Sequence, residues 1–197
     1  DDVIKVLNAK ETKGTLFMVG AHVSTEWRKQ RLTDAHASKY VEVANHSTSH
    51  ANNEYREYYK DPKEILAGFD KSTKTLKITK KPVPARLPGR NTWRLAGVTR
   101  TASDSGAAAD LLHKNGYRLY GWDVEWHMKG GVSVESADEV IAKIDHHVKA
   151  GKLAKAGKVI LLTHDVMFRE SKGGKIKLER LIDKLKASGY SMDFVSN

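Results

Sequence analysis

The chain has 197 residues, of which 40% are hydrophobic and 29% are charged, as in an ordinary globular domain. The absence of cysteine excludes disulfides and thiolate metal sites, and no apolar run approaches the roughly 20 residues that span a bilayer. The net charge of +10 favours an anionic neighbour, but the basic residues are dispersed and no nucleic-acid-binding motif accompanies them. We therefore expect one domain over residues 1–197 with no membrane span and no nucleic acid partner, and its oligomeric state stays open.

Short apolar strands alternate with amphipathic helices along the chain. We expect strands over residues 14–20, 40–44, 84–86, 117–124, 159–162 and 190–195. Helices are expected to start at Asp61-Pro62, at Ser103 or Asp104, at Ser136 and at Lys175, with capping boxes at the first and third of these starts. Repeated βα units of this kind predict a parallel sheet, open or closed into a barrel.

Two histidines four residues apart, His46 and His50, follow directly on the strand expected over residues 40–44. If this segment is one helical turn, both imidazoles lie on the same face and can reach one metal ion. A strand that runs straight into a histidine pair often places metal ligands at the mouth of an α/β fold. The spacing indicates a metal site, with solvated or hydrogen-bonded histidines as the alternative.

Ionisable residues also follow three other expected strands. They are Arg86 after the strand near residue 85, Asp123 and Glu125 in the strand from residue 117, and His164 after residues 159–162. In parallel α/β folds the working residues gather at the carboxyl ends of the strands. Four such ends on one face favour a metal-dependent hydrolase.

The succession of motifs resembles the NodB-homology polysaccharide deacetylases, carbohydrate esterase family 4, over nearly the whole chain. In chain order the motifs are GTLFMVG, NHSTSH, ARLPGR, WDVEW and ILLTHD. Residues 46–50 match the H-S/T-x-x-H motif fully, and Leu162-Thr163-His164 matches the L-x-H motif. The resemblance implies a distorted (β/α) barrel that uses one divalent metal to remove N-acetyl groups from amino sugars or O-acetyl groups from xylan.

The resemblance also implies catalytic roles. His46 and His50 would be ligands of the metal, with zinc as the expected ion. His164 would be the general acid that protonates the leaving nitrogen, and Arg86 would orient the catalytic base.

Substrate contacts are implied in the same way. Leu162 would line the pocket for the acetyl methyl group, with Trp126 as a further wall or, alternatively, a core residue. A backbone N–H in the loop that contains Pro88 and Gly89 would stabilise the oxyanion.

The chain departs from the family pattern at its first motif, T-F-D-D-G, which carries the base and the third metal ligand. The chain begins at Asp1-Asp2 and continues with Val3-Ile4 instead of Gly-Pro. Two alternatives stay open. Either this pair is the motif and Asp2 is the third ligand, or the pair caps the first helix and the first strand is missing from this sequence, which is the preferred interpretation.

Two later motifs depart as well. The third motif lacks the aromatic residue of the family pattern R-x-P-Y-G. The fourth motif is compressed, so that either Asp123 or Glu125 would orient His164.

The sequence thus predicts a metal-dependent deacetylase that acts on an N-acetylglucosamine polymer such as peptidoglycan, a chitin-like chain or poly-N-acetylglucosamine. Family resemblance alone suggests a periplasmic, cell-envelope or secreted protein. The alternatives are a non-catalytic carbohydrate-binding member that lacks a complete metal and base motif, and an O-acetyl xylan esterase.

Overall fold

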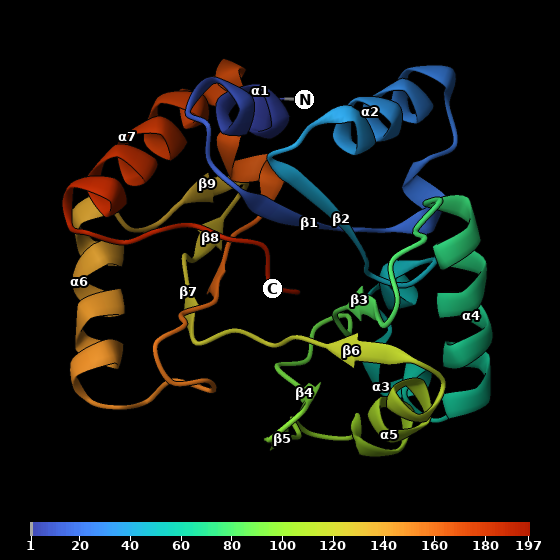
Figure 1. Ribbon diagram of the computed structural model, residues 1–197. Coiled ribbons are helices and arrows are strands. Elements are labelled where there is room, and N and C mark those ends of the chain that lie inside the picture. Colours follow the sequence, from blue (N-terminus) through green and yellow to red (C-terminus); the bar gives the residue numbers. More distant parts are fainter. Residues whose placement is uncertain (1) are drawn as a thin grey trace. The chain divides into compact units, whose positions relative to one another are not determined.

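The computed structural model describes residues 2–197 of the chain, which form two compact units (Figure 1). The first unit contains the described residues up to Gly14 together with Ser38–Val41 and Trp122–Phe194. The second unit contains Thr15–Ala37, Glu42–Gly121 and Val195–Asn197. Each unit therefore joins segments that lie far apart in the sequence.

A six-stranded mixed sheet forms the framework of the second unit. Its strand order is β1-β2-β3-β6-β4-β5, with β3 parallel to both β2 and β6 and with β4 antiparallel to β5 and β6. The strands are β1 (Gly14–Met18), β2 (Val41–Asn45), β3 (Val83–Ala85), β4 (Trp93–Leu95), β5 (Val98–Arg100) and β6 (Tyr117–Leu119). The helices are α2 (Glu26–Ala37), α3 (Tyr55–Tyr58), α4 (Pro62–Thr75) and α5 (Gly106–Lys114), with short 3-10 segments η1 (Gly20–His22) and η2 (His50–Asn53).

The helix α4 begins where the sequence predicts. The Asp61 side chain accepts hydrogen bonds from the backbone N–H groups of Lys63 and Glu64 at 2.9 and 3.0 Å, so it satisfies two donors that the helix leaves open. Pro62 occupies the first helical position, where no N–H is needed. On the face toward the core, Phe69 is fully buried.

The first unit combines three longer helices with short strands. The helices are α1 (Asp2–Ala9), α6 (Ala137–Lys149) and α7 (Gly174–Ala187), with 3-10 segments η3 (Asp165–Phe168) and η4 (Glu170–Lys172). Strands β7 (Val124–Glu125) and β10 (Leu161–Leu162) pair in parallel, and β8 (Met128–Lys129) and β9 (Val132–Ser133) form an antiparallel hairpin. The helix α7 packs against both α6 and α1.

The predicted capping box of α6 is confirmed. The Ser136 hydroxyl accepts from the Glu139 N–H, and the Glu139 carboxylate accepts from the Ser136 N–H. Gly151 follows the helix in the left-handed conformation with φ of 62°, as a C-terminal glycine does. The helix α5 begins at Gly106 instead of Ser103 or Asp104, and Ser105 is its cap residue.

The strand predicted over residues 117–124 is interrupted. β6 ends at Leu119, and β7 begins only at Val124. Between them, a Cβ atom at Gly121 would lie 2.1 Å from Asn91 Oδ1 and 2.2 Å from Trp93 Nε1. The chain passes these side chains too closely to continue as a regular strand with a side chain at each position.

The strand predicted over residues 190–195 is wrong. The Tyr190 N–H donates to the Leu185 carbonyl at the end of α7, and its hydroxyl donates to Asp145 at 2.6 Å. The Val195 N–H donates to Thr15 Oγ1 at 3.1 Å. The segment is held by these separate bonds instead of a ladder between strands. No helix in residues 2–197 is long and apolar enough to cross a membrane.

Candidate active site

His46 stands at the carboxyl end of β2, a strand whose residues are all buried. Its backbone N–H donates to the Met18 carbonyl at the end of β1, with an N···O distance of 2.9 Å. Its ring nitrogen Nδ1 lies 2.9 Å from the carbonyl oxygen of Arg86. Because a carbonyl only accepts, Nδ1 carries the hydrogen, and Nε2 carries the lone pair that a metal ion binds.

His50 begins η2, so the segment from His46 to His50 is not the single helical turn that was considered as one way of bringing the two rings together. Instead, Asn45 Oδ1 accepts from the Ser47 N–H at 2.8 Å, and Ser47 Oγ accepts from the His50 N–H at 3.0 Å. Local side-chain bonds of this kind compete with helix formation. The two imidazole rings still meet, with centroids 4.9 Å apart and planes at 68°.

The backbone from His50 to Asn53 is left-handed at four consecutive residues. Their φ angles are 53°, 59°, 48° and 65°, and none of these residues is glycine. A left-handed residue other than glycine costs on the order of 1–3 kcal/mol, and such residues cluster at ligand and active sites. The conformation that brings His50 beside His46 is therefore held against a local cost.

Two neighbouring imidazoles with nitrogen lone pairs fit half of a zinc site. Within residues 2–197, no group of three or more His, Asp or Glu side chains is arranged to hold a metal ion. Asp2, the third ligand in one of the two alternatives, lies in the first turn of α1, and its Oδ2 accepts from the Glu170 N–H at 2.9 Å. Asp1 lies outside the described residues. The third ligand therefore stays a prediction.

The Arg86 side chain is buried beneath the loop that follows β3. Its Nε donates to the Tyr120 carbonyl at 3.0 Å, and one terminal nitrogen donates to the Gly121 carbonyl at 2.9 Å. The guanidinium also lies 4.1 Å from the centre of the Phe17 ring. Burial lowers the pKa of Arg86 to about 9. These contacts fix the side chain firmly, while its role toward a catalytic base stays a prediction.

Aromatic side chains from α3 pack against the loop of Pro88 and Gly89. The Pro88 carbonyl accepts from the hydroxyl of Tyr59, the residue that follows α3, at 2.7 Å. Gly89 has φ of 62°, and a Cβ atom there would lie 2.8 Å from the Tyr55 ring. The Arg90 guanidinium lies over both tyrosine rings. Sequence reasoning missed these tyrosines, although they follow the histidine motif closely in the chain.

Asp123 and Glu125 belong to the first unit. Asp123 Oδ1 accepts from the Ala154 N–H at 2.7 Å, and its Oδ2 accepts from the Ile160 N–H at 2.8 Å, so the carboxylate braces the chain that enters β10. Glu125 lies in β7, opposite Leu162 of β10. Which carboxylate orients His164 stays a prediction.

The other predicted residues of the first unit are Trp126, Leu162 and His164. Trp126 is fully buried, its Nε1 donates to the Glu135 carbonyl at 2.8 Å, and its ring centroid lies 5.5 Å from that of Phe168. This burial favours the core alternative for Trp126. Leu162 ends β10, and His164 follows it two residues later; both side chains are half-buried.

Residues 46–53, which follow β2 and carry both histidines, are called the histidine loop below. A cleft of about 510 Å³ lies against this loop in the second unit, between η2, α3 and α4. Its volume falls in the range of small-molecule sites. Three of its lining residues are glutamates, so the cleft suits a polar ligand. The lining residues are Thr48, Ser49, Ala51, Asn52, Glu54, Glu57, Tyr58, Glu64, Ile65, Ala67, Gly68 and Lys71.

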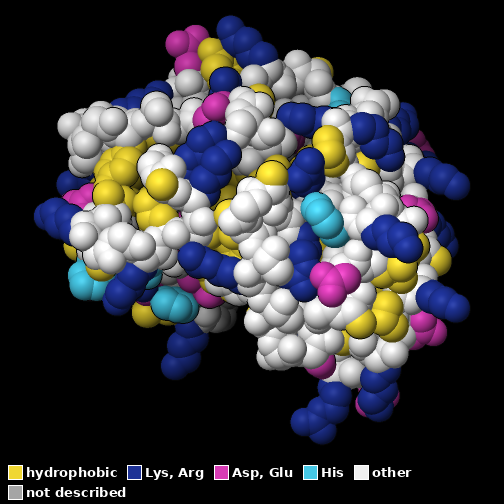
Figure 2. Space-filling view, turned by 60° about the horizontal axis from the view of Figure 1, so that its bottom comes forward, with side chains coloured by type: hydrophobic (Ala, Val, Ile, Leu, Met, Phe, Trp, Pro, Cys, Tyr) yellow, Lys and Arg dark blue, Asp and Glu magenta, His cyan; other side chains and the backbone are white. Residues whose placement is uncertain are grey.

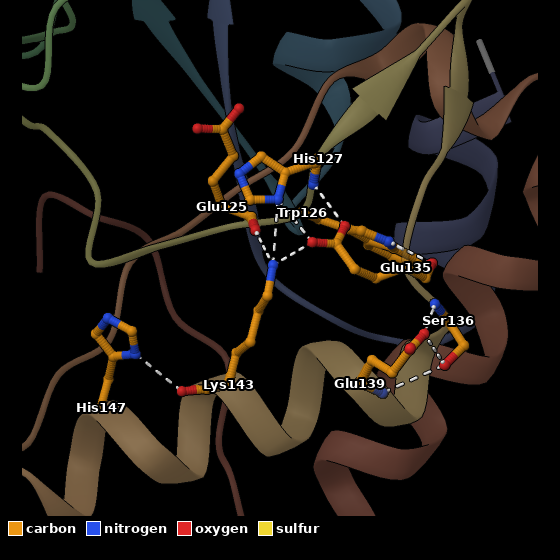
Figure 3. Close-up of polar contacts among 8 residues, drawn as sticks. All are labelled: Glu125, Trp126, His127, Glu135, Ser136, Glu139, Lys143 and His147. Atoms are coloured by element: carbon orange, nitrogen blue, oxygen red, sulfur yellow. Dashed lines mark hydrogen bonds and ion pairs between the residues drawn. The ribbon is translucent and has the colours of Figure 1, made fainter.

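A second polar cluster, which sequence reasoning did not predict, lies in the first unit (Figure 3). Glu135 accepts from the His127 N–H at 2.9 Å, and its other carboxylate oxygen lies 2.6 Å from His127 Nδ1 and also pairs with Lys143. Burial alone raises the pKa of Glu135, but the bonds from His127 and Lys143 outweigh it and lower the pKa to about 2. This cluster is an ion-pair network centred on one carboxylate.

The positive charge is spread over the surface. Figure 2 shows one face of the molecule, over which Lys and Arg side chains are widely spread, with fewer Asp and Glu side chains among them. The picture agrees with the dispersed basic residues of the sequence.

Comparison with known families identifies the chain. The family model described as polysaccharide deacetylase matches residues 1–100, and the chain belongs to this family. The family prediction is therefore confirmed. Among curated proteins, the chain is similar to a chitin disaccharide deacetylase of Vibrio alginolyticus, with 25% identity in an alignment that covers 100% of this chain and 67% of the relative.

Solved structures confirm the predicted α/β deacetylase fold. A family 4 carbohydrate esterase from Streptococcus mutans matches 98% of this chain and 78% of its own, with 19% identity and a TM-score of 0.69. A peptidoglycan deacetylase from Bacillus subtilis matches 99% of this chain and 80% of its own, with 20% identity and a TM-score of 0.63. A family 4 pseudoenzyme from Bacillus anthracis matches 99% of this chain and 58% of its own, with 19% identity and a TM-score of 0.57.

Proposed function

We propose that the protein is a zinc-dependent hydrolase that removes N-acetyl groups from an N-acetylglucosamine polymer of the cell envelope or its surroundings. The observation that carries the proposal is the meeting of the His46 and His50 rings, with centroids 4.9 Å apart. The bond from His46 Nδ1 to the Arg86 carbonyl supports it, because this bond leaves Nε2 as the coordinating nitrogen. Family membership supports the substrate class.

The chemistry requires few groups. Zinc, when bound, supplies a Lewis acid and lowers the pKa of water toward neutrality. His46 and His50 would hold the ion, and a backbone N–H of the loop 86–90 would stabilise the oxyanion. Water adds to the acetyl carbon and gives a proton to the catalytic base, whose residue stays a prediction. As the C–N bond then breaks, His164 gives its proton to the departing nitrogen, so that acetate and a free amine are released. The assignment of His164 rests on the L-x-H motif.

A second candidate is a carbohydrate-binding member of the fold without catalysis. It is favoured by the lack of a three-ligand cluster within residues 2–197 and by the similarity in fold to a pseudoenzyme. An O-acetyl xylan esterase would use the same residues on an ester.

Acetate release tests these candidates directly. The purified protein is loaded with zinc and incubated with chitooligosaccharides, with peptidoglycan fragments or with acetylated xylan. We expect release from an amino-sugar substrate, and a loss of more than about 100-fold in His46→Ala and His50→Ala. His146→Ala, an exposed histidine of α6, is the matched control and should keep full activity.

The outcomes separate the candidates. If acetate is released from acetylated xylan alone, the protein is an O-acetyl esterase and the proposed amide hydrolysis is wrong. Binding of the sugar without release from any substrate would establish the non-catalytic member. His164→Ala should lower turnover by about 10²–10⁴-fold while zinc still binds. Loss of zinc in this variant would contradict its role as the general acid.

A further inference from the structure

Tyr55, at the start of α3, contacts both the histidine loop and the loop 86–90 that follows β3. Its hydroxyl oxygen lies 3.4 Å from His50 Nδ1 and 3.4 Å from Asn53 Oδ1. Its ring meets the His50 ring edge-on, with centroids 5.9 Å apart and planes at 77°. The hydroxyl therefore stands between one candidate metal ligand and an amide oxygen.

The number of hydrogens sets the direction of these bonds. An amide oxygen only accepts, so the single hydroxyl hydrogen of Tyr55 goes to Asn53. The hydroxyl oxygen then accepts at His50, and the hydrogen in that bond must come from Nδ1. This direction of the bonds corresponds to the tautomer of His50 in which Nε2 carries the lone pair. His46 takes the same tautomer through the Arg86 carbonyl.

The Tyr55 ring is held in place independently of His50. Gly89 leaves room for the ring, since a Cβ atom there would lie 2.8 Å from Tyr55 Cε1. The Arg90 guanidinium lies 5.6 Å from the ring centroid on the same loop. The position of the hydroxyl is thus fixed by the loop after β3, and the hydroxyl in turn acts on the loop after β2.

We propose that Tyr55 is a positioning residue that fixes the ring orientation and the Nε2-coordinating tautomer of His50. The proposal rests on the zinc site of the proposed function. A hydrogen-bond partner on the other ring nitrogen of a metal-binding histidine raises metal affinity because the ligand is already oriented before the metal arrives. Asn53 has a supporting part, since it directs the hydroxyl hydrogen away from His50.

The test compares Tyr55→Phe with Tyr190→Phe. Both changes remove one tyrosine hydroxyl, but the Tyr190 hydroxyl donates to Asp145 of α6. Zinc affinity is measured by competition with a chromophoric chelator, and the imidazole tautomers of the metal-free protein by ¹⁵N NMR. We expect zinc affinity to fall about 10–100-fold in Tyr55→Phe and less than two-fold in Tyr190→Phe.

The tautomer measurement gives a readout that a purely structural role would not move. In the wild type, His50 should show a protonated Nδ1, and Tyr55→Phe should show a mixture of both tautomers with an unchanged His46 signal. Asn53→Gly keeps the left-handed backbone and removes the amide, so its zinc affinity should fall by less than that of Tyr55→Phe.

Two results overturn different statements. If the wild type binds zinc and Tyr55→Phe binds it equally well with the same His50 tautomer, the role of Tyr55 is wrong and the zinc site stands. If the wild type binds no zinc at His46 and His50, the proposed function itself is wrong.

Discussion

Histidines are held in two different ways in the two units. In the second unit, His46 donates to a carbonyl and His50 contacts a tyrosine hydroxyl, both of which are uncharged. In the first unit, His127 meets the Glu135 carboxylate and the Lys143 ammonium. A neutral acceptor and a carboxylate at Nδ1 both leave Nε2 for a metal ion, so the acceptor by itself does not separate the two sites. The neighbour of the ring distinguishes the two sites: a second imidazole lies beside His46, with ring centroids 4.9 Å apart, whereas the Lys143 ammonium lies 3.1 Å from His127 Nδ1.

The backbones of the two regions differ as well. The hairpin beside His127 turns through Gly130 and Gly131, with φ of 60° and 76°, which glycine adopts without cost. The histidine loop turns through residues 50–53 with no glycine at all. The first region is thus built for stability, and the second keeps a costly conformation that positions His50.

The largest expected effect is on the core beside Glu135. Trp126→Ala removes a fully buried indole and its bond to the Glu135 carbonyl, so it should lower the free energy of unfolding by about 3–5 kcal/mol. Denaturant titration measures this loss. Trp27→Ala is the control, because Trp27 is 61% exposed and its removal should change stability by less than about 0.5 kcal/mol. Equal losses in the two variants would contradict the assignment of Trp126 to the core.

Glu135→Gln comes next. It removes the charge to which His127 and Lys143 bond, and should lower the free energy of unfolding at pH 7 by about 1.5–3 kcal/mol. Zinc affinity should stay unchanged, because the cluster is an ion-pair network and not a ligand set. If Glu135→Gln also lost zinc affinity, the Glu135 cluster could not be separated in function from the candidate zinc site at His46 and His50.

Acid should abolish this advantage of Glu135. The pKa of the Glu135 carboxyl is about 2 in the folded protein and has its ordinary value in the unfolded chain. The contribution of this charge to the free energy of unfolding is therefore complete above about pH 4.5 and disappears as the pH falls toward about 2. The difference in stability between the wild type and Glu135→Gln should therefore narrow, by about half near pH 3. A difference that is constant from pH 7 to pH 3 would show that Glu135 gains nothing from its charge.

The smallest effect concerns the left-handed histidine loop. Asn52→Gly suits φ of 48° and should raise the free energy of unfolding by about 0.5 kcal/mol, whereas Asn52→Ala should lower it by a similar amount. Thermal unfolding of both variants gives the comparison. If alanine stabilises the protein as much as glycine, residue 52 is not held in a left-handed conformation.

Local signals in the sequence predicted much of the fold. The Ser136 capping box and the Asp61-Pro62 start depend only on neighbouring residues, and both are confirmed. The break after β6 depends on the packing of Gly121 against Asn91 and Trp93, which lie far away in the sequence. No local pattern signals such a contact.

In the candidate site, too, the features that depend on neighbouring residues could be predicted, and those that depend on distant contacts could not. The spacing of His46 and His50 predicted that their rings meet, although the loop is not a helical turn. The part of Tyr55 could not be predicted, because it depends on the missing side chain of Gly89 in a loop distant in sequence. The roles of the other site residues stay predictions.

Each unit is built from segments that lie far apart in the sequence, which affects how the chain folds during synthesis. The first unit packs α1 against α7, and Lys10 pairs with Asp183 at 2.7 Å, so contacts join its earliest and latest segments. Long loops must close before these contacts form, and chains dominated by such contacts fold slowly. On the ribosome, α1 emerges before α7 and cannot make these contacts until α7 has been synthesised. Until then its apolar face, with Val6 and Leu7, lacks its native cover and is open to chaperones or to aggregation.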